Sequence, residues 1–331
     1  MTASARDRVV VDVPASVFVT GANGFMGRAL MARLRELGAQ ATGVDLIADA
    51  EHGVVGGSTT DPQKWPQALE GVDAVIHTAA IVSNVASIDQ AWEVNVLGTR
   101  RVLEAAATAG VSRFLHISSV AAYGTSITGV LDERFPIRVE GRSYVDSRVN
   151  SEAVVLAAHA SGEIPCTIVR PGDLFGPGAV WVREPIRMLR SHQMILPAGG
   201  KGIFSPTYID NLVDGVLLAL SSEAGVGQIF NITDDVSMTC EEFFGALATF
   251  AGGSVRTIPT SLAVPLGELL GTATRAVGWH SEANRASVLY LARQGTFSIE
   301  KARRLLGYEP RVSFAEGMAR VQAWAHEEGV I

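Results

Sequence analysis

The sequence predicts an α/β protein, a doubly wound parallel sheet with a smaller, mostly helical lobe at its C-terminal end. Two observations carry this prediction. Short apolar runs rich in β-branched residues alternate with segments of helical periodicity as far as Pro171, and such alternation favours a parallel sheet. Beyond Pro171, the residues Gly172, Gly176, Pro177 and Gly178 break the alternation, so we expect a second lobe to begin there.

The expected elements can be given in chain order. Strands are predicted at 16–20, 41–45, 74–78, 114–118 and 166–170. Apolar residues recur between them at helical spacing, as Leu30, Leu34 and Leu37 do, so each linking segment can cover a face of the sheet. Later segments are predicted as a helix at 181–190, a helix at 212–220, a strand at 228–233, a helix at 238–251 and a helix-rich stretch at 257–290.

This organisation divides the chain into two expected domains. Residues 1–175, completed by about 205–235, form the sheet domain, and residues 176–204 and 236–331 form the lobe. The chain has 331 residues with 47% apolar and 18% charged types, so it can bury a substantial core. Its net charge of −7 gives no basic surface for a polyanion, and we therefore expect no nucleic-acid partner.

Several other classes of protein are disfavoured by the composition. The two cysteines, Cys166 and Cys240, lie far apart and outside any CxxC pattern, which predicts reduced core thiols. None of the seven histidines has a metal-binding spacing, so no metal site is expected. We also expect no secretion signal, no membrane span and a cytoplasmic location.

A glycine-rich turn joins the first predicted strand to the first predicted helix. Gly21, Gly24 and Gly27 have the spacing G-x-x-G-x-x-G. Glycines here permit a tight turn, a close approach of the backbone to a pyrophosphate, and close packing of helix on strand. The exposed N–H groups and the helix dipole then favour an anion. The turn is interpreted as a dinucleotide site, and an ordinary glycine-rich turn is the alternative.

An acidic residue ends the second predicted strand. Asp45 lies eighteen positions beyond Gly27, and a carboxylate there can accept both hydroxyls of an adenosine ribose and would repel a 2′-phosphate. Leu46 and the five residues after it include no Arg or Lys to hold such a phosphate. NAD is therefore predicted over NADP, with a loop-capping aspartate as the alternative.

Five motifs in order extend this pattern over nearly the whole chain. They are TGANGFMG at 20–27, HTAA at 77–80, NVLGT at 95–99, ISSVAAYG at 117–124 and RPGDLFGPG at 170–178. With them, the sequence resembles the extended short-chain dehydrogenase/reductase family of NAD-dependent epimerase/dehydratase type, which implies a Rossmann fold. The late segments YIDN at 208–211 and KARRLLGYEP at 301–310 look most like its 3-beta-hydroxysteroid and sterol dehydrogenase branch.

The resemblance implies a catalytic set of Ser119, Tyr144 and the residue four positions later, where the family has lysine and this chain has Arg148. A tyrosine has a reference pKa of about 10 and is a poor base alone; a cation one helical turn away favours its ionised form. Arg148 keeps the charge but not the geometry of an ammonium group. Because only three of the 27 basic residues are lysines, a general bias toward arginine is the alternative explanation.

The resemblance also implies a set of cofactor-binding residues around these positions. A structural role is the alternative for Ala79, Ala80, Pro171 and Leu174, and Asn95 is expected to act structurally. The full predicted set is Gly21, Asn23, Gly24, Phe25, Met26, Gly27, Asp45, Leu46, Ser58, Thr59, Thr78, Ala79, Ala80, Ser118, Tyr144, Arg148, Pro171 and Leu174.

The function predicted from this set is an NAD-dependent oxidoreductase that interconverts a secondary alcohol and a ketone on a hydrophobic small molecule. Two alternatives stay open: a nucleotide-sugar epimerase or dehydratase with tightly bound NAD, and a non-catalytic NAD-binding regulator, which the missing lysine suggests. The resemblance further implies a homodimer formed through the helices near 95–110 and 144–160.

Overall fold

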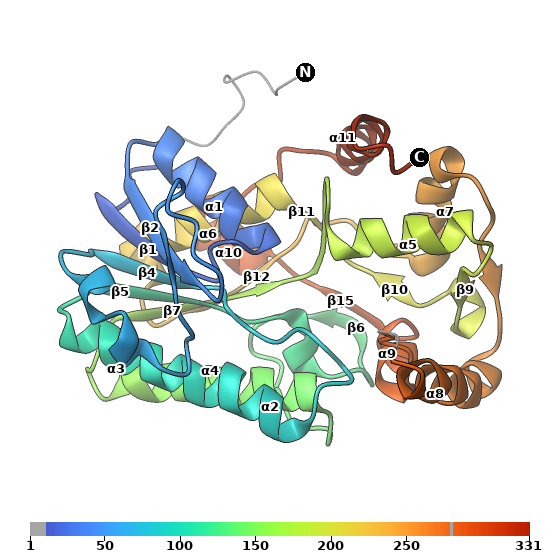
Figure 1. The fold of residues 1–331 in the computed structure, drawn as a ribbon, viewed down its shortest axis with the longest axis horizontal. Helices are drawn as coiled ribbons and strands as arrows, with labels where there is room; N and C mark the ends of the chain where they lie inside the picture. Colours follow the sequence, from blue (N-terminus) through green and yellow to red (C-terminus); the bar gives the residue numbers. More distant parts are fainter. Residues whose placement is uncertain (1–10, 279–280) are drawn as a thin grey trace.

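A computed structural model describes residues 11–278 and 281–331. Its centre is a seven-stranded parallel sheet in the order β12-β7-β5-β4-β1-β2-β3, with β1 next to the point where the strand order reverses (Figure 1). The strands of this sheet are β1 (Ser16–Thr20), β2 (Gln40–Asp45), β3 (Val54–Gly56), β4 (Ala74–His77), β5 (Arg113–Ile117), β7 (Cys166–Pro171) and β12 (Ile229–Ile232).

Helices cover both faces of the sheet, because successive side chains of each strand point to opposite sides. Val17 and Val19 pack toward α1 and α6, whereas Phe18 packs toward α3 and α4. The two layers lie above and below the sheet in Figure 1. Their helices are α1 (Phe25–Glu36) and α6 (Ile209–Ser221) on one face, and α3 (Thr99–Thr108) and α4 (Ser143–Ala160) on the other.

The C-terminal lobe lies beyond the carboxyl ends of the strands and is mostly helical (Figure 1). Its aromatic core, around Phe204, Phe243 and Phe244, is continuous with the core on the α1 side of the sheet. Its elements are α5 (Val180–Arg190), β9 (Ile195–Leu196), β10 (Ile203–Phe204), β13 (Met238–Thr239), α7 (Cys240–Ala251), β14 (Arg256–Thr257), α8 (Thr260–Ala276) and α9 (Arg285–Tyr290).

The remaining elements connect the two parts. They include two more strand pairs, β8 with β11 and β6 with β15. These elements are α2 (Ile88–Trp92), the π-helical stretch η3 (Glu93–Gly98), β6 (Thr128–Leu131), β8 (Asp173–Phe175), β11 (Pro206–Tyr208), β15 (Gln294–Phe297), α10 (Glu300–Leu306), α11 (Phe314–Glu327), and the 3-10 turns η1 (Pro62–Lys64), η2 (Pro66–Leu69), η4 (Val120–Tyr123), η5 (Ala198–Gly200) and η6 (Glu223–Gly225).

The predicted fold class is confirmed, and the predicted elements lie within a few residues of the observed ones. The strand expected at 228–233 joins the sheet as β12, next to β7. The limits of the two domains stay a prediction, and residues 1–10 of the first one lie outside the described part. Cys166 and Cys240 are both buried and free. Among the described helices, none combines the length and the apolar character needed to cross a membrane.

Candidate active site

The glycine-rich turn forms a close-packed cradle at the start of α1. Gly21 has a φ of +70°, and a Cβ added to Gly27 would lie 2.1 Å from the carbonyl oxygen of Gly21. The helix starts after Gly24 with no side-chain cap and no acidic residue in its first turn. Its first N–H groups therefore have no protein carboxylate or hydroxyl to satisfy them, which suits an anionic ligand.

The cradle packs directly against the end of β4. A Cβ at Gly21 would lie 2.9 Å from the Thr78 hydroxyl and 3.0 Å from the backbone of Ala79. The Thr78 hydroxyl itself donates to the Thr20 carbonyl, 2.7 Å away. Ala79 and Ala80 are partly exposed just beyond. The carboxyl ends of β1 and β4 therefore lie side by side at the reversal of strand order, and small residues cover them. In an open α/β sheet, ligands usually bind at such a reversal.

Asp45 ends β2 beside the same cradle, and both of its oxygens accept backbone hydrogen bonds. One accepts from the Asn23 N–H at 2.9 Å, and the other from the Leu46 N–H at 2.7 Å. The Asn23 amide donates onward to the Ile47 carbonyl. An ionised carboxylate has about four lone-pair positions, so Asp45 keeps capacity for ribose hydroxyls while it holds the loop. The predicted role and its loop-capping alternative are therefore compatible.

The other predicted cofactor residues of this half lie around the cradle. Phe25 approaches the chain near Gly176, where a Cβ would lie 3.4 Å from its ring, and Met26 is partly buried in the first turn of α1. The Ser58 hydroxyl bonds to Thr60, and Thr59 is buried.

Tyr144 and Arg148 lie one turn apart on α4. Arg148 is 4% exposed, and its guanidinium carbon lies 5.1 Å from the centroid of the Tyr144 ring. One guanidinium nitrogen donates to the Ile117 carbonyl at 3.1 Å, which ties α4 to the end of β5. The structure therefore brings a buried cation and a partly exposed phenol together at the carboxyl edge of the sheet.

Two serines follow β5, and their hydroxyls have different partners. The Ser119 hydroxyl accepts from the Ala121 N–H at 3.1 Å and caps η4, and the residue is partly exposed. The Ser118 hydroxyl donates to buried Glu152 at 2.5 Å, and Glu152 pairs with buried Arg170. Ser119 is thus the serine with side-chain exposure beside α4, while the side chain of Ser118 belongs to a buried network.

Three further residues named from the sequence, Pro171, Leu174 and Asn95, lie on β7, β8 and η3. Pro171 pairs with Ile232 of β12, and Leu174 is the partly exposed residue of β8. Asn95 accepts from the Ile81 N–H at 2.8 Å and donates to the Ile81 carbonyl and to the Ser147 hydroxyl, each at 2.9 Å. Asn95 therefore fixes the chain after Ala80 to α4, a structural role of the kind expected for it.

Two buried histidines lie beneath Arg148 at the ends of β4 and β5. Burial, and then the positive charge of Arg148, lower the pKa of His77 to about 3. Burial, His77 and Arg148 together hold the pKa of His116 well below its usual value. The two rings are stacked with centroids 5.5 Å apart. Both imidazoles are therefore neutral at physiological pH.

The structure contains a polar cluster, centred on Asp173, that the sequence did not predict. Asp173 of β8 accepts from the Tyr290 hydroxyl at 2.7 Å and forms an ion pair with Arg293. Asp173 falls inside the RPGDLFGPG motif, which is the one local signal for it. Its two partners lie more than a hundred residues away along the chain, so no sequence spacing connects them.

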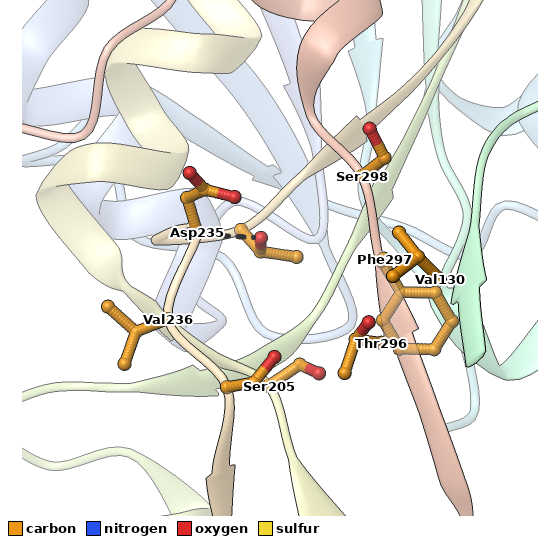
Figure 2. A pocket seen from close by; sticks show the side chains of 9 residues that line it. Val130, Ser205, Asp235, Val236, Thr296, Phe297 and Ser298 are labelled. Carbon is orange, nitrogen blue, oxygen red and sulfur yellow. Dashed lines mark hydrogen bonds between the residues drawn. The ribbon is translucent and has the colours of Figure 1, made fainter. Parts of the chain in front are cut away.

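Next to this cluster is a cavity of about 240 Å³ rich in hydroxyl groups (Figure 2). None of its lining residues is a predicted site residue, but the backbone N–H of Ser205 donates to Asp173. The lining consists of Val130, Ser205, Thr233, Asp235, Val236, Ser237, Thr296, Phe297 and Ser298. In the described ranges, no three His, Cys, Asp or Glu side chains converge as metal ligands would.

A model of the NAD dependent epimerase/dehydratase family matches residues 17–233, well over half of the chain. The chain belongs to this family. The predicted resemblance is confirmed, and so is NAD as the cofactor to which the family is adapted. The glycine cradle, where a Cβ would collide with backbone, and the uncapped start of α1 fit a bound dinucleotide phosphate.

Characterised members of the family resemble the chain over most of its length. A 4-hydroxy-2-methyl-3-oxo-4-farnesyl-3,4-dihydroquinoline-1-oxide ketoreductase of Stigmatella aurantiaca is 29% identical, over 91% of this chain and 94% of that protein. A 3 beta-hydroxysteroid dehydrogenase/Delta 5-->4-isomerase of Mycobacterium tuberculosis is 30% identical, over 89% of this chain and 86% of that protein. The solved structure of an epimerase from Methanothermobacter thermautotrophicus shares the fold, with a TM-score of 0.78, 24% identity, and coverage of 96% and 94% of the two chains.

Proposed function

We propose that the protein is an NAD-dependent oxidoreductase that interconverts a secondary alcohol and a ketone. The observation that carries the proposal is the pairing of Tyr144 with Arg148 on α4. A guanidinium that is 4% exposed lies 5.1 Å from the phenol ring, at the edge of the sheet where Ser119 and the glycine cradle also lie. Such a pairing supplies an acid/base group and a fixed positive charge at this edge of the sheet.

The proposed mechanism assigns one task to each of these side chains. In the oxidative direction, Tyr144 accepts the hydroxyl proton of the alcohol while Ser119 orients the same oxygen by a hydrogen bond. Arg148 stabilises the phenolate form of Tyr144 from which this proton transfer starts, and it contributes to cofactor binding. NAD, when bound, takes up the hydride. The Arg148 charge is permanent because an arginine side chain does not deprotonate in proteins.

The proposed division of labour follows the two predicted domains. Residues 1–175, with about 205–235, would bind NAD through the cradle, Asp45, and the small residues after β4. Residues 176–204 and 236–331 would bind the substrate. The preference for NAD over NADP rests on the Asp45 carboxylate, beside which Leu46 is exposed and no basic side chain follows as far as residue 51.

A hydrophobic substrate is supported by the relatives. One acts on a compound with a farnesyl chain and the other is a steroid dehydrogenase. An epimerase that keeps its NAD is the second candidate, favoured by the shared fold with an epimerase. The two differ in a measurable way, because only the oxidoreductase releases or consumes NADH in net turnover.

Tyr144→Phe tests the proposal directly, since it removes the proton-transferring hydroxyl and keeps the ring against Arg148. With NADH and a panel of hydrophobic ketones, including 3-oxo steroids, we expect kcat to fall by at least roughly 100-fold. NAD affinity, measured by fluorescence titration, should change by less than about threefold. Tyr308→Phe is the matched control, because Tyr308 is a buried tyrosine that donates to the Thr233 carbonyl outside the site. Equal activity of Tyr144→Phe and wild type would contradict the proposed role of Tyr144.

A further inference from the structure

Glu152 is a carboxylate buried in the middle of α4. It is 0% exposed, and it lies about two helical turns after Tyr144 and one after Arg148, so the three side chains share one face of the helix. A buried charge is costly unless it is paired and hydrogen-bonded. Glu152 meets this condition through two residues outside the helix, Ser118 and Arg170.

The contacts of Glu152 are close and use both of its oxygens. Oε1 accepts from the Ser118 hydroxyl at 2.5 Å and from Nε of Arg170 at 2.8 Å. Oε2 accepts from Nη2 of Arg170 at 2.6 Å. Arg170 is itself 2% exposed, so the ion pair is bidentate and shielded from water. A pair of this geometry holds the carboxylate in one orientation.

This carboxylate ties α4 to the carboxyl ends of two neighbouring strands. Ser118 directly follows β5, Arg170 lies near the end of β7, and the two strands pair in parallel. The Ser118 N–H donates to the Val169 carbonyl at 2.7 Å, so the strand ends are also joined to each other. The next residue is Ser119, whose hydroxyl is proposed to orient the substrate oxygen. Glu152 therefore fixes α4 against the strand end from which Ser119 extends.

The same network holds the far end of the short turn η4, which begins after Ser119. The Ser119 hydroxyl caps this turn, and Tyr123 is its last residue. The Arg170 guanidinium carbon lies 4.6 Å from the centroid of the Tyr123 ring, and the Tyr123 hydroxyl donates to Asn231 at 2.8 Å. Ser119 thus lies between two anchored residues, Ser118 before it and Tyr123 after it.

A second contact with β5 lies one turn earlier on α4. Arg148 donates to the carbonyl of Ile117, the residue before Ser118, at 3.1 Å. Successive turns of the helix therefore bind successive residues of one strand end. Stability alone does not require an ion pair here, because replacing a buried pair by apolar residues of similar volume is often neutral or stabilising. What the pair of Glu152 and Arg170 adds is a defined geometry.

We propose that Glu152 is a positioning residue of the proposed active site, which through Ser118 and Arg170 sets the place of the Ser119 hydroxyl relative to Tyr144. The inference rests on the proposed oxidoreductase function and adds to it a residue that acts through its neighbours. A misplacement of about 1 Å at a reacting centre can lower a rate by on the order of 100-fold. Loss of these contacts should therefore affect kcat far more than binding.

The test is a double-mutant cycle on kcat, measured with NADH and the best ketone of the panel. Ser118→Ala removes one hydroxyl and leaves the pair of Glu152 and Arg170 in place. We expect it to lower kcat about tenfold, with KM for the ketone and the affinity for NADH within about threefold of wild type. Adding Ser118→Ala to Ser119→Ala should lower kcat by less than about twofold further, because Ser118 acts through Ser119.

Glu152→Gln extends the cycle to the carboxylate itself. It keeps the size of the side chain but sets an amide N–H group against the Arg170 guanidinium, and it should lower kcat by at least about tenfold, again with little further loss in Ser119→Ala. If Glu152→Gln does not fold, Ser118→Ala decides the question. Thr167→Val is the matched control: it removes a buried hydroxyl of β7 that donates to the Gly225 carbonyl, and it should keep kcat within about twofold of wild type.

Hydrogen exchange of the unliganded protein gives a readout that does not depend on turnover. The N–H groups of Ala121 and Ala122 both donate to Ser119, to its hydroxyl and its carbonyl. In Ser118→Ala these two amides should exchange at least about tenfold faster than in wild type, whereas the amides of β1 should exchange at the wild-type rate. A general loss of stability would instead speed exchange in both places.

The outcomes separate this inference from the proposed function. Wild-type kcat in Ser118→Ala, losses that multiply in the double variant, or unchanged exchange at Ala121 and Ala122 would overturn the positioning role and leave the proposed function standing. Wild-type kcat in Ser119→Ala would remove the task assigned to Ser119 and this inference with it, while Tyr144→Phe still tests the function. A wild type that turns over no ketone of the panel would overturn both.

Discussion

Arg148 supplies the positive charge beside Tyr144, and its contacts fix the position of that charge. Its guanidinium is buried, donates to the Ile117 carbonyl at 3.1 Å and faces the Tyr144 ring at 5.1 Å. A planar, delocalised cation can make these contacts together, whereas an ammonium on a shorter stem would have to give up at least one. The neutral imidazoles of His77 and His116 beneath it add no competing positive charge. The arginine thus has two partners in its surroundings, and its Nε is buried without a hydrogen-bond partner among the described residues.

Replacing this residue by the family's lysine tests these contacts. We expect Arg148→Lys to lower kcat about tenfold and to reduce stability by about 1–2 kcal/mol, because the carbonyl bond and the contact with the ring are lost in a buried place. Turnover of NADH with the best ketone of the panel and urea unfolding are the two measurements. Arg142→Lys, on the partly exposed residue before α4, is the control and should change neither. Higher turnover in Arg148→Lys would instead show that the natural pair is impaired.

At the scale of single residues, the sequence predicted the parts of the site that lie in local motifs. The glycines follow from the steric demands of one turn, whereas Tyr144 and Arg148 come from the family resemblance, and their roles stay predictions. Tyr290 and Arg293 could not be found in this way, since their partner Asp173 is 117 and 120 positions away along the chain. Contacts at that separation depend on how the lobe folds back, and no local pattern encodes them.

Strand β4 ends in buried His77, which faces buried His116 of β5, and hydrogen bonding fixes how His77 is protonated. The Thr99 hydroxyl donates to the Asn95 carbonyl, so it accepts from Nε2 of His77. The other ring nitrogen, Nδ1, then accepts from the Thr20 hydroxyl at 2.8 Å. Because both ring nitrogens are used by the neutral form, a second proton on His77 would reverse the bond to Thr20 and leave the Thr20 hydroxyl proton without this acceptor.

This arrangement predicts a loss of stability in mild acid. The folded pKa of His77 is about 3, and an unfolded histidine titrates near 6.5. The unfolded chain therefore takes up a proton below pH 6.5 that the folded chain refuses until about pH 3, so stability falls across that window as pH falls. For His77 alone the loss amounts to about 2 kcal/mol between pH 7.5 and 5.

Urea unfolding of His77→Gln at the two pH values checks the expectation. The variant should be less stable at pH 7.5, since it loses buried hydrogen bonds, but its further loss at pH 5 should be about 2 kcal/mol smaller than that of wild type. His326→Gln, on an exposed position of α11, should keep the wild-type difference. A pH dependence unchanged in His77→Gln would show that His77 does not titrate on unfolding in this range.

The sequence predicts those helices and strands that carry a clear pattern of apolar residues. The six predicted strands of the sheet are rich in buried apolar residues, and each was found within two residues of its expected ends. The edge strand β3 has three residues, two of them exposed, and therefore lacks such a pattern. The pair β6 and β15 brings together segments about 165 residues apart, with Thr128 opposite Gln294. Short or distant pairings of this kind are stabilised by tertiary contacts, which a single sequence does not display.

On the scale of the whole molecule, hydrogen bonds attach the C-terminal lobe to the sheet domain. The loop after β4 and the segment before α9 are joined by hydrogen bonds from Ser83 and the Asn84 backbone to Glu282, at 2.7 and 2.9 Å, and from Asn284 to the Asn84 carbonyl. Figure 1 shows α9 beside the carboxyl edge of the sheet, near β6 and β15. This attachment joins the segment before α9 to the loop that follows β4.

The helical layer on the α4 side predicts how two copies of the chain associate. Apolar side chains with large exposed fractions lie on three adjoining elements of this layer: Ile88 (56%) and Trp92 (38%) on α2, Leu97 (37%) on η3, and Leu156 (37%) on α4. Burying such a face against its copy is favourable at roughly 25 cal/mol per Å² of apolar surface. Helix α8 of the lobe also exposes leucines, Leu262 and Leu269 among them; we expect the homodimer through the α4 layer because the family resemblance implies the helices near 95–110 and 144–160, which lie there.

Light scattering on a sizing column measures the association. Wild type should elute with twice the mass of the chain at micromolar concentration, and the double variant Leu97→Glu, Leu156→Glu should elute as a monomer, because two buried carboxylates per copy would lack partners. Leu262→Glu changes an equally apolar, 60% exposed residue on α8 of the lobe and should leave the dimer intact. A monomeric wild type would contradict the expected homodimer. Dissociation caused by Leu262→Glu, and not by the double variant, would show that the interface lies on the lobe and not on the α4 side. Because α4 also carries Tyr144 and Arg148, a monomeric variant with lower turnover would show that the dimer supports the helix on which the proposed chemistry depends.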